Sequence, residues 1–270
     1  MIEVKHLTKD YGHQRGIFDI HFCVQEGEIF GYVGTNGSGK TTTIRHLMGF
    51  LKPDSGSVTI MGMDAITQAC EIKKYIGYVP GEIAFPDLKT GIDFLHAQAE
   101  LLHLKDMSYA NYLISKLQLD PSAKLKRMSK GMKQKTAIVA ALMADPKIII
   151  MDEPTTGLDP LMRTAFIDII LEEKKKGKTI FMSSHIFEEI ESTCDKVALI
   201  RNGKLVSIAD MNQIRHHNIK TYQIRFKTKK DYQSFLSLSY SVIETKENVF
   251  QATIQIQDEE INTLFSDLSS

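Results

Sequence analysis

The segment from Gly34 to Thr41, GTNGSGKT, is the feature that most limits how this chain can fold. It fits the pattern G-x-x-x-x-G-K-[ST], in which glycines allow backbone N–H groups to surround phosphate oxygens. Residues 28–33 read as a strand before the loop, and a helix is expected to open at Thr41. We therefore predict a nucleoside triphosphate site rather than a glycine-rich turn with a surface lysine. Lys40 is expected to reach the β- and γ-phosphates, and the Thr41 hydroxyl is expected to bind Mg²⁺.

Two carboxylates follow a strongly apolar strand later in the chain. Residues 148–151, Ile-Ile-Ile-Met, have the continuous hydrophobicity of a central strand covered on both faces. Asp152 and Glu153 come next and would lie at the carboxyl edge of the sheet, where ligands of open α/β sheets collect. We expect Asp152 to stand on the metal side and Glu153 to polarise the attacking water.

The order of predicted elements indicates an α/β domain over residues 1–208 and a small accessory domain over residues 209–270. Strand-like and helix-like segments alternate through the first region, and residues 85–145 are almost wholly helical, as in an inserted subdomain. The second region reads as β-α-β-β-α: strands at 221–226, 240–245 and 249–256, and helices at 230–238 and from Asp258. The predicted elements of the first region are strands at 2–5, 17–24, 28–33, 57–61, 75–79, 148–151, 179–183 and 196–201, and helices at 41–50, 91–103, 109–117, 130–144 and 161–175.

Charge and composition limit the class of protein further. The 33 Lys and Arg balance 33 Asp and Glu, which argues against a protein that holds nucleic acid by bulk electrostatics. No stretch approaches the roughly 18 apolar residues that span a bilayer. The three cysteines, Cys23, Cys70 and Cys194, are widely separated and read as reduced thiols. These observations predict a neutral intracellular protein.

The ordered motifs resemble those of the ATP-binding subunits of ABC transporters over residues 1 to about 205. Residues 34–41 match the Walker A loop, Thr42 also follows the family pattern, and residues 148–153 match Walker B with its catalytic glutamate. The resemblance implies ATP and Mg²⁺ as cofactors. It also implies a RecA-like mixed sheet core, an antiparallel β subdomain and an inserted helical subdomain. Three further residues match by position: Tyr11 the aromatic that stacks on adenine, Asp159 the D-loop aspartate, and His185 the switch histidine that contacts the γ-phosphate. The ATP-binding residues implied are Tyr11, Gly34, Thr35, Asn36, Gly37, Ser38, Gly39, Lys40, Thr41 and Thr42.

Two motifs depart from the family pattern. The signature LSGGQ stands here as MSKGM, in which Ser129 and Gly131 are retained and Lys130 adds positive charge. The SKGMKQ form resembles that of exporters, including peptide-antibiotic and drug efflux systems. At the Q-loop, Gly81 occupies the position of the usual glutamine. Glu82 is then either a substitute metal ligand or a solvated loop acid.

The resemblance implies an ATPase subunit whose partners are separate chains. Two cassettes, either two copies or a paralogous pair, would close around two Mg-ATP, with Ser129, Lys130 and Gly131 acting on the opposite subunit's nucleotide. Integral-membrane permease subunits would dock near residues 82–95, which places the protein in the cytoplasm on the inner face of the membrane, and no nucleic acid is expected.

Other functions remain open at this point. One is a soluble, non-transport ATPase of the same superfamily that acts on ribosomes or nucleic acid. Another is a small-molecule kinase. The region 209–270 reads either as a structural cap or as a regulatory or dimer-stabilising extension.

Overall fold

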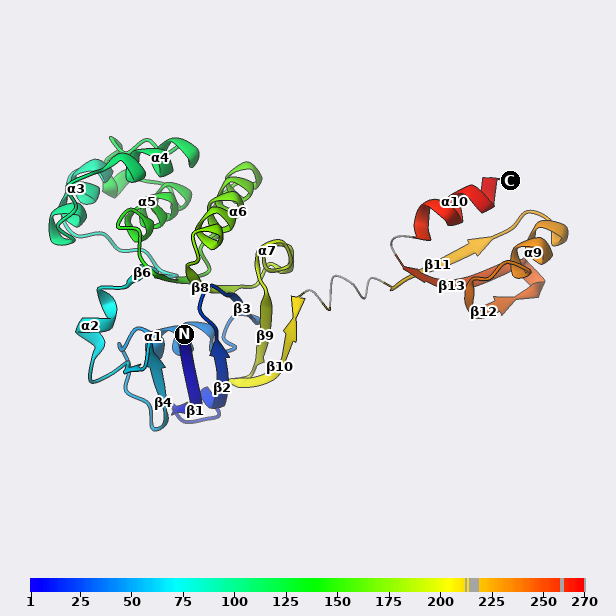
Figure 1. The fold of residues 1–270 in the computed structure, drawn as a ribbon, viewed down its shortest axis with the longest axis horizontal. Coiled ribbons are helices and arrows are strands. Elements are labelled where there is room, and N and C mark those ends of the chain that lie inside the picture. Colours follow the sequence, from blue (N-terminus) through cyan, green and yellow to red (C-terminus); the bar gives the residue numbers. More distant parts are fainter. Residues whose placement is uncertain (212, 214–218, 258–259, 270) are drawn as a thin grey trace. The chain divides into compact units, whose positions relative to one another are not determined.

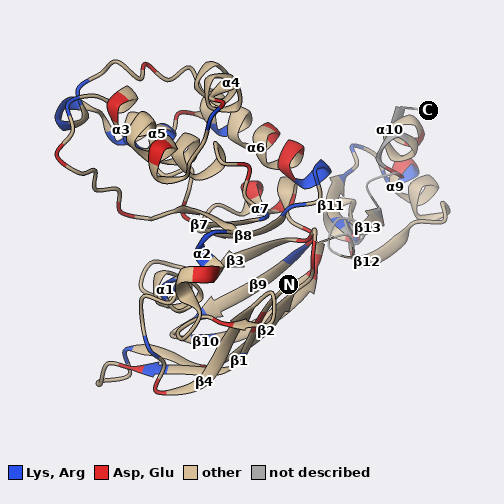
Figure 2. Ribbon diagram, turned by 60° about the vertical axis from the view of Figure 1, so that its left-hand side comes forward, with Lys and Arg blue, Asp and Glu red and all other residues tan. Residues whose placement is uncertain are grey.

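The computed structural model describes residues 1–211, 213, 219–257 and 260–269. They divide into two compact units, Met1–Met211 and Asn212–Ser270. Acidic and basic residues are interspersed along the ribbon of the first unit, in keeping with its balanced charge (Figure 2). No helix among the described residues combines the length and the hydropathy needed to cross a bilayer.

A six-stranded sheet forms the centre of the first unit (Figure 1). All of its strands run parallel except the edge strand β10, which is antiparallel to β9. The middle strands are buried along nearly their whole length, which explains their continuous hydrophobic sequences. In order across the sheet, the strands are β10 (Lys204–Asp210), β9 (Lys196–Arg201), β3 (Ile29–Val33), β8 (Thr179–Ser184), β7 (Ile148–Asp152) and β6 (Ile76–Val79).

An antiparallel sheet packs against this centre. Its strands, in spatial order, are β2 (Gly16–Val24), β1 (Ile2–Asp10), β4 (Ser55–Ile60) and β5 (Met63–Asp64). Aromatic rings join the two sheets: the centroid of Phe22 on β2 lies 5.2 Å from Phe30 on β3 and 5.6 Å from Phe181 on β8. Helix α1 (Lys40–Leu47) shares this core through Ile44 and Leu47.

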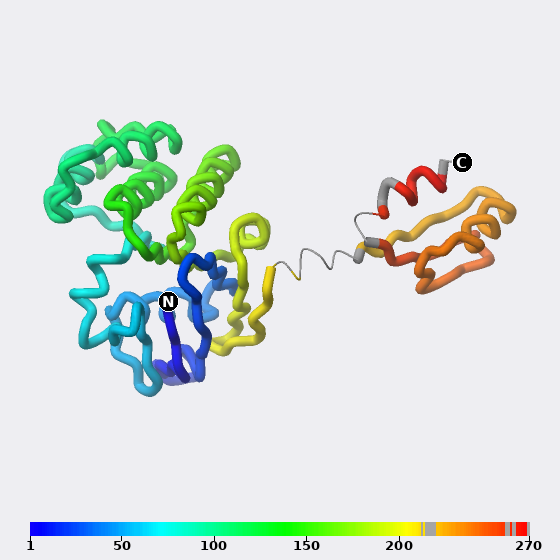
Figure 3. The backbone as a smooth tube through the Cα atoms, viewed as in Figure 1, coloured from blue at the N-terminus to red at the C-terminus, as the bar shows by residue number. Residues whose placement is uncertain are grey.

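The helical group is inserted between two neighbouring strands. The backbone leaves β6, passes through α3 (Gly91–Leu101), α4 (Ser108–Lys116) and α5 (Lys130–Leu142), and returns as β7 beside β6 (Figure 3). Each longer helix has an identifiable start. Thr90 and Asp93 form a capping box on α3, and Ser129 caps α5 by accepting a hydrogen bond from the N–H of Met132.

The predicted strands and helices of the first unit are present, and some short elements went unpredicted. These are α2 (Ala69–Lys73), β5, the 3₁₀ turn Leu125–Arg127, α7 (Phe187–Thr193) and β10. Strand β10 follows a tight turn in which Asn202 and Gly203 have φ of 50° and 72°, the geometry that hairpins favour. The first unit continues to Met211, which is fully buried and donates its N–H to the carbonyl of Asp195.

The second unit has the predicted β-α-β-β-α order. Its sheet, in the order β11-β13-β12, is antiparallel. One face of it buries Tyr232, Phe235 and Leu264 against Ala252, Ile254 and Ile256. The elements are β11 (Ile219–Arg225), α9 (Lys229–Leu236), β12 (Ser241–Lys246), the 3₁₀ turn Glu247–Val249, β13 (Gln251–Gln257) and α10 (Ile261–Ser269). The predicted start of the last helix, Asp258, lies outside the described residues.

Candidate nucleotide site and family

The phosphate-binding loop joins β3 to α1, as its sequence predicts. Gly39 precedes the helix with φ of 112°, and a side chain there would place Cβ 2.6 Å from Ile17 Cγ2. Both the backbone angle and the lack of space therefore require glycine at this position. Lys40 is only 5% exposed, and its Nζ donates to the carbonyl oxygens of Gly34 at 2.7 Å and Thr35 at 3.2 Å. The loop holds its lysine against its own backbone, facing the space inside the loop.

Asp152 lies at the end of β7 and receives two hydroxyl hydrogen bonds. Thr41 Oγ1 donates to Oδ2 at 2.7 Å, and Ser183 Oγ, on the neighbouring strand β8, donates to Oδ1 at 2.6 Å. The carboxylate is almost completely buried, with its residue 1% exposed. Both oxygens of this buried charge are thus paired, which such a group requires. Ser183 was not among the predicted site residues, although the strand that contains it was predicted at residues 179–183.

Glu153 connects the lysine of the loop to the histidine after β8. Its Oε1 lies 3.2 Å from Lys40 Nζ, and its Oε2 lies 3.3 Å from His185 Nδ1. Its φ of 48° is left-handed, which is uncommon for a residue with a side chain. The backbone N–H of Glu153 donates to Ser183 Oγ at 3.0 Å and so helps to fix this turn. The predicted residues Lys40, Glu153 and His185 are therefore in contact, although they are far apart in the sequence.

A cavity of about 570 Å³ opens between the loop and the carboxylates. It contains the predicted residues Asn36, Gly37, Gly39, Lys40, Thr41, Thr42, Gly81, Glu82, Lys130, Asp152 and Glu153, and in addition Arg45, Tyr78, Pro80 and Thr156. Burial, together with the negative charge of Asp152, raises the pKa of Tyr78 to about 12, so this phenol remains protonated. Tyr78 could have been anticipated, because it stands near the carboxyl end of β6, beside β7.

The segments predicted as Q-loop and signature both reach this cavity, through Gly81, Glu82 and Lys130. A side chain at Gly81 would place Cβ 3.0 Å from Asp152 Oδ2, so the backbone passes directly over the carboxylate. Glu82 is exposed and lines the cavity. A Cβ on Gly131 would stand 2.6 Å from the carbonyl oxygen of Gly157, so the segments predicted as signature and D-loop are in direct contact.

The remaining predicted residues lie around the cavity rather than along its walls. Tyr11 is 52% exposed in the turn between β1 and β2. Asp159 caps α6 (Pro160–Lys175) by accepting a hydrogen bond from the N–H of Met162 at 2.9 Å. Ser38 Oγ is buried and has no hydrogen-bond partner among the described residues. Gly34 must lack a side chain, because a Cβ there would meet Ser38 Oγ at 2.4 Å.

The donor set at the base of the cavity suits Mg²⁺ in a nucleotide site. The Thr41 hydroxyl and the Asp152 carboxylate are hard oxygen ligands within 2.7 Å of each other. Mg²⁺ in such sites takes one or two protein oxygens and completes its octahedron with phosphate oxygens and water. These two residues fit that requirement.

Comparisons with known proteins agree with this geometry. The family model described as ABC transporter matches residues 17–156. An uncharacterized ABC transporter ATP-binding protein of Methanocaldococcus jannaschii is 37% identical over 218 residues, covering 79% of each chain. The bacitracin transport ATP-binding protein BcrA of Bacillus licheniformis is 36% identical over 82% of this chain and 73% of its own. The linearmycin resistance ATP-binding protein LnrL of Bacillus subtilis is 34% identical over 77% of this chain and 68% of its own.

Solved structures have the same fold. A structure described as the ATP-binding subunit of an ABC transporter superposes with a TM-score of 0.72 and 32% identity, covering 80% of this chain and 92% of that one. A dimeric bacterial ABC transporter cassette superposes with a TM-score of 0.70 at 23% identity, covering 78% and 99%. The mixed central sheet, the antiparallel β subdomain and the inserted helices are thus those of ABC ATPase cassettes. Fold, nucleotide-site geometry and relatives agree that this chain belongs to the ABC transporter family, as an ATP-binding ATPase subunit.

Proposed function

We propose that the chain hydrolyses Mg-ATP in a pair of cassettes and thereby drives separate membrane permease subunits, in the direction of export. The observation that supports this most strongly is the continuous contact from Lys40 through Glu153 to His185 at the carboxyl edge of the sheet. It brings a phosphate-binding cation and a candidate base to one cavity, and it holds a candidate γ-phosphate sensor, His185, against that base. Such a set can position and activate water for attack on a terminal phosphate.

The roles of these residues follow from their present partners. Besides its ion pair with Glu153, Lys40 donates to two neutral carbonyls, and anionic phosphate oxygens would be stronger acceptors for those hydrogens. Glu153 would accept the proton of the attacking water. His185, which lies against the other carboxylate oxygen, would contact the γ-phosphate. Thr41 and Asp152 would hold Mg²⁺, whose charge offsets the charge that develops on the phosphate oxygens. Tyr11 would stack on the adenine ring.

The signature would complete the site of a second cassette, either another copy or a paralogue. Ser129 and Gly131 stand at the N-terminus of α5, where backbone N–H groups and the helix dipole favour an anion such as a γ-phosphate. Lys130 adds positive charge beside them. Asp159, at the start of α6, would communicate across the pair. The similar cassette cited above was solved as a dimer, which supports this arrangement.

Export and a membrane partner rest on sequence likeness and on the docking segment. The bacitracin transport and linearmycin resistance proteins are relatives. In addition, the SKGMKQ run of this chain resembles the signature of peptide-antibiotic efflux systems. Residues 82–95 connect the Q-loop to α3 and would receive a permease helix, so that nucleotide binding is passed to the membrane. The subunit would then lie on the cytoplasmic face of the membrane.

The test combines hydrolysis, assembly and co-purification. Glu153→Gln should lower ATP turnover by about 10²-fold or more while an ATP-bound dimer accumulates in size-exclusion chromatography, because binding groups remain and the base is lost. Glu188→Gln, at an exposed position of α7, is the matched control and should hydrolyse ATP normally. An integral membrane protein should co-purify with the tagged chain. Normal turnover by the Glu153 variant would show that Glu153 is not the general base. Hydrolysis that nucleic acid stimulates, without a membrane partner, would favour a non-transport ATPase.

A further inference from the structure

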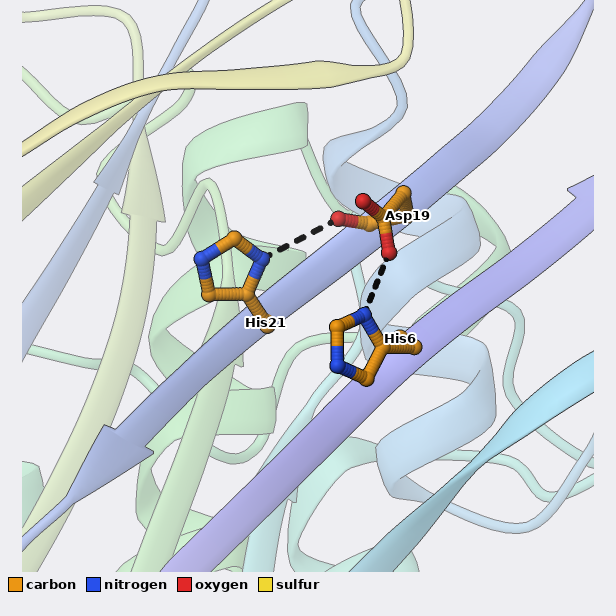
Figure 4. A group of neighbouring side chains, drawn as sticks. All are labelled: His6, Asp19 and His21. Carbon is orange, nitrogen blue, oxygen red and sulfur yellow. Dashed lines mark hydrogen bonds and ion pairs between the residues drawn. The ribbon is translucent and has the colours of Figure 1, made fainter.

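Two histidines and an aspartate form a cluster on the antiparallel sheet, outside the nucleotide site (Figure 4). His6 lies on β1, and Asp19 and His21 lie on β2. One candidate ligand atom from each residue lies within 4.8 Å of the other two. His6 Nδ1 is 2.6 Å from Asp19 Oδ1, and His21 Nδ1 is 3.3 Å from the backbone oxygen of Asp19. All three residues are exposed, so the cluster is open to ions from solution.

The pairing of the two strands places these side chains on one face. Leu7 pairs with Ile20, and both are fully buried on the inner face of the sheet. Because side chains alternate along a strand, the neighbours of this pair, His6, Asp19 and His21, turn to the outer face. The cluster therefore lies where the pairing of two strands is interrupted, with paired residues on either side of it, rather than on a loop.

The backbone is also irregular at this point. The register between β1 and β2 shifts between Val4 and Leu7, that is, around His6. His6 and Asp19 have φ of 48° and 55°, in the left-handed region that residues with side chains seldom adopt. Bulges of this kind change the direction in which nearby side chains point. Here the bulge brings the imidazole of His6 onto the carboxylate of Asp19.

We propose that His6, Asp19 and His21 bind a divalent transition-metal ion, with Zn²⁺ as the ion of choice. Zn²⁺ bonds of about 2.0–2.1 Å in tetrahedral geometry separate neighbouring ligand atoms by about 3.4 Å. The present separations, from 2.6 Å to at most 4.8 Å, bracket this value, so small side-chain rotations suffice. Two imidazoles and one carboxylate suit Zn²⁺ far better than Mg²⁺, which prefers oxygen ligands. Three protein ligands leave the fourth position to water.

This ion would bridge the two strands that carry the turn with Tyr11. It differs in chemistry from the Mg²⁺ proposed at Thr41 and Asp152, whose ligands are all oxygen. The competing account of the same atoms is a plain ion pair between His6 and Asp19. That pair does not need His21, and this difference separates the two accounts.

The experiment uses the full chain, stripped of metal with a chelator, and titrates Zn²⁺ alone by calorimetry without nucleotide. His21→Ala keeps the His6–Asp19 pair and should weaken this binding by about tenfold or more, as should Asp19→Asn. His96→Ala removes an exposed histidine from α3 and should leave the titration unchanged. Circular dichroism of each variant verifies the fold.

A second readout tests the geometry. Co²⁺ added in place of Zn²⁺ should give the intense visible absorption of tetrahedral coordination in the wild type and the His96 variant, and lose it in His21→Ala. A large excess of Mg²⁺ should not displace the ion. Zn²⁺ titrations of His21→Ala and Asp19→Asn that match the wild type in stoichiometry and affinity would overturn the proposal.

Discussion

The hydroxyl of Ser183 donates a 2.6 Å hydrogen bond to Oδ1 of Asp152, across the neighbouring parallel strands β8 and β7. The two residues are directly paired in the sheet register, and both are buried. The same hydroxyl accepts the backbone N–H of Glu153. A single serine therefore orients the buried carboxylate and the first turn of the segment that carries the candidate base.

Ser183→Ala should destabilise the fold and slow hydrolysis together. It removes a hydrogen bond to a buried charge, for which we expect about 2 kcal/mol lost from the free energy of unfolding. Turnover should fall by about tenfold, and the Mg²⁺ concentration needed for half-maximal rate should rise, because Asp152 is no longer held. Denaturant unfolding and a Mg²⁺ titration of ATPase rate measure both effects. Ser192→Ala, at an exposed position, should change stability by less than about 0.5 kcal/mol. A Ser183 variant that behaves like this control contradicts the assigned role.

Glu82→Ala tests whether this chain replaces the Q-loop glutamine with the next residue. A Cβ on Gly81 would stand only 3.0 Å from Asp152 Oδ2, whereas Glu82 lines the cavity and is exposed. If the Glu82 carboxylate binds the metal or orients the attacking water, turnover by the Glu82→Ala variant should fall by about tenfold with little change in ATP affinity. Glu100→Ala, on the exposed side of α3, is the matched control. Equal rates for the two variants would make Glu82 a solvated loop acid.

Lys178→Met should be strongly destabilising without touching the nucleotide cavity. Lys178 and Glu173 are both buried and form an ion pair, and Lys178 also donates to Asp145. Removing Lys178 leaves the buried carboxylate of Glu173 less compensated, which should lower the free energy of unfolding by about 3 kcal/mol. This value is at the lower end for a broken buried ion pair, because Tyr109 still donates a hydrogen bond to Glu173. Unfolding by denaturant measures the loss. The exposed Lys175→Met should be nearly neutral, and adding Glu173→Gln to the Lys178 variant should recover part of the stability.

The contact between α4 and α6 should weaken in acid. The Lys116 ammonium, 2.5 Å from Glu172, and the Tyr112 hydroxyl hold the pKa of Glu172 below its ordinary value of 4.5. A lowered folded-state pKa gives stability that is complete above pH 4.5 and is lost as the pH falls below it, towards the folded pKa. Because Glu172 is partly exposed, solvent screening keeps the contribution below about 1 kcal/mol.

Lys116→Met measures this contribution directly. The stability difference between wild type and variant should be present at about pH 7 and should shrink as the pH falls below 4.5 and through the folded-state pKa, by denaturant unfolding. Lys105→Met, at an exposed position before α4, is the control. A difference that does not change with pH would assign the effect of Lys116 to packing instead.

Local signals in the sequence were sufficient for most of the site. The glycine and lysine spacing of residues 34–41 predicts a phosphate-binding loop between a strand and a helix, and residues 148–153 show a buried strand followed by carboxylates. Each motif includes the strand that comes before its polar residues. The sequence therefore predicted correctly that Lys40 and Thr41 begin a helix and that Asp152 and Glu153 lie at the end of a strand.

Contacts that depend on register could not be read in the same way. Ser183 reaches Asp152 only because β8 lies next to β7 with those two residues paired, and no local pattern encodes strand order. The sequence also did not predict the cluster of His6, Asp19 and His21. A bulge between two strands brings these residues together, and no local pattern indicates where such a bulge lies. Helix α7 was missed because seven residues are too few for a helical period to stand out.

The contact between Gly131 and Gly157 has a practical consequence for mutagenesis. Any side chain at position 131 would push on the carbonyl of Gly157, and the chain at Gly157 passes over Lys130. A bulky signature variant therefore shifts the D-loop of its own subunit as well as any surface offered to a partner. An activity defect in such a variant reports two perturbations at once. In the proposed pair of cassettes, mixed dimers with one altered and one intact subunit would separate the two.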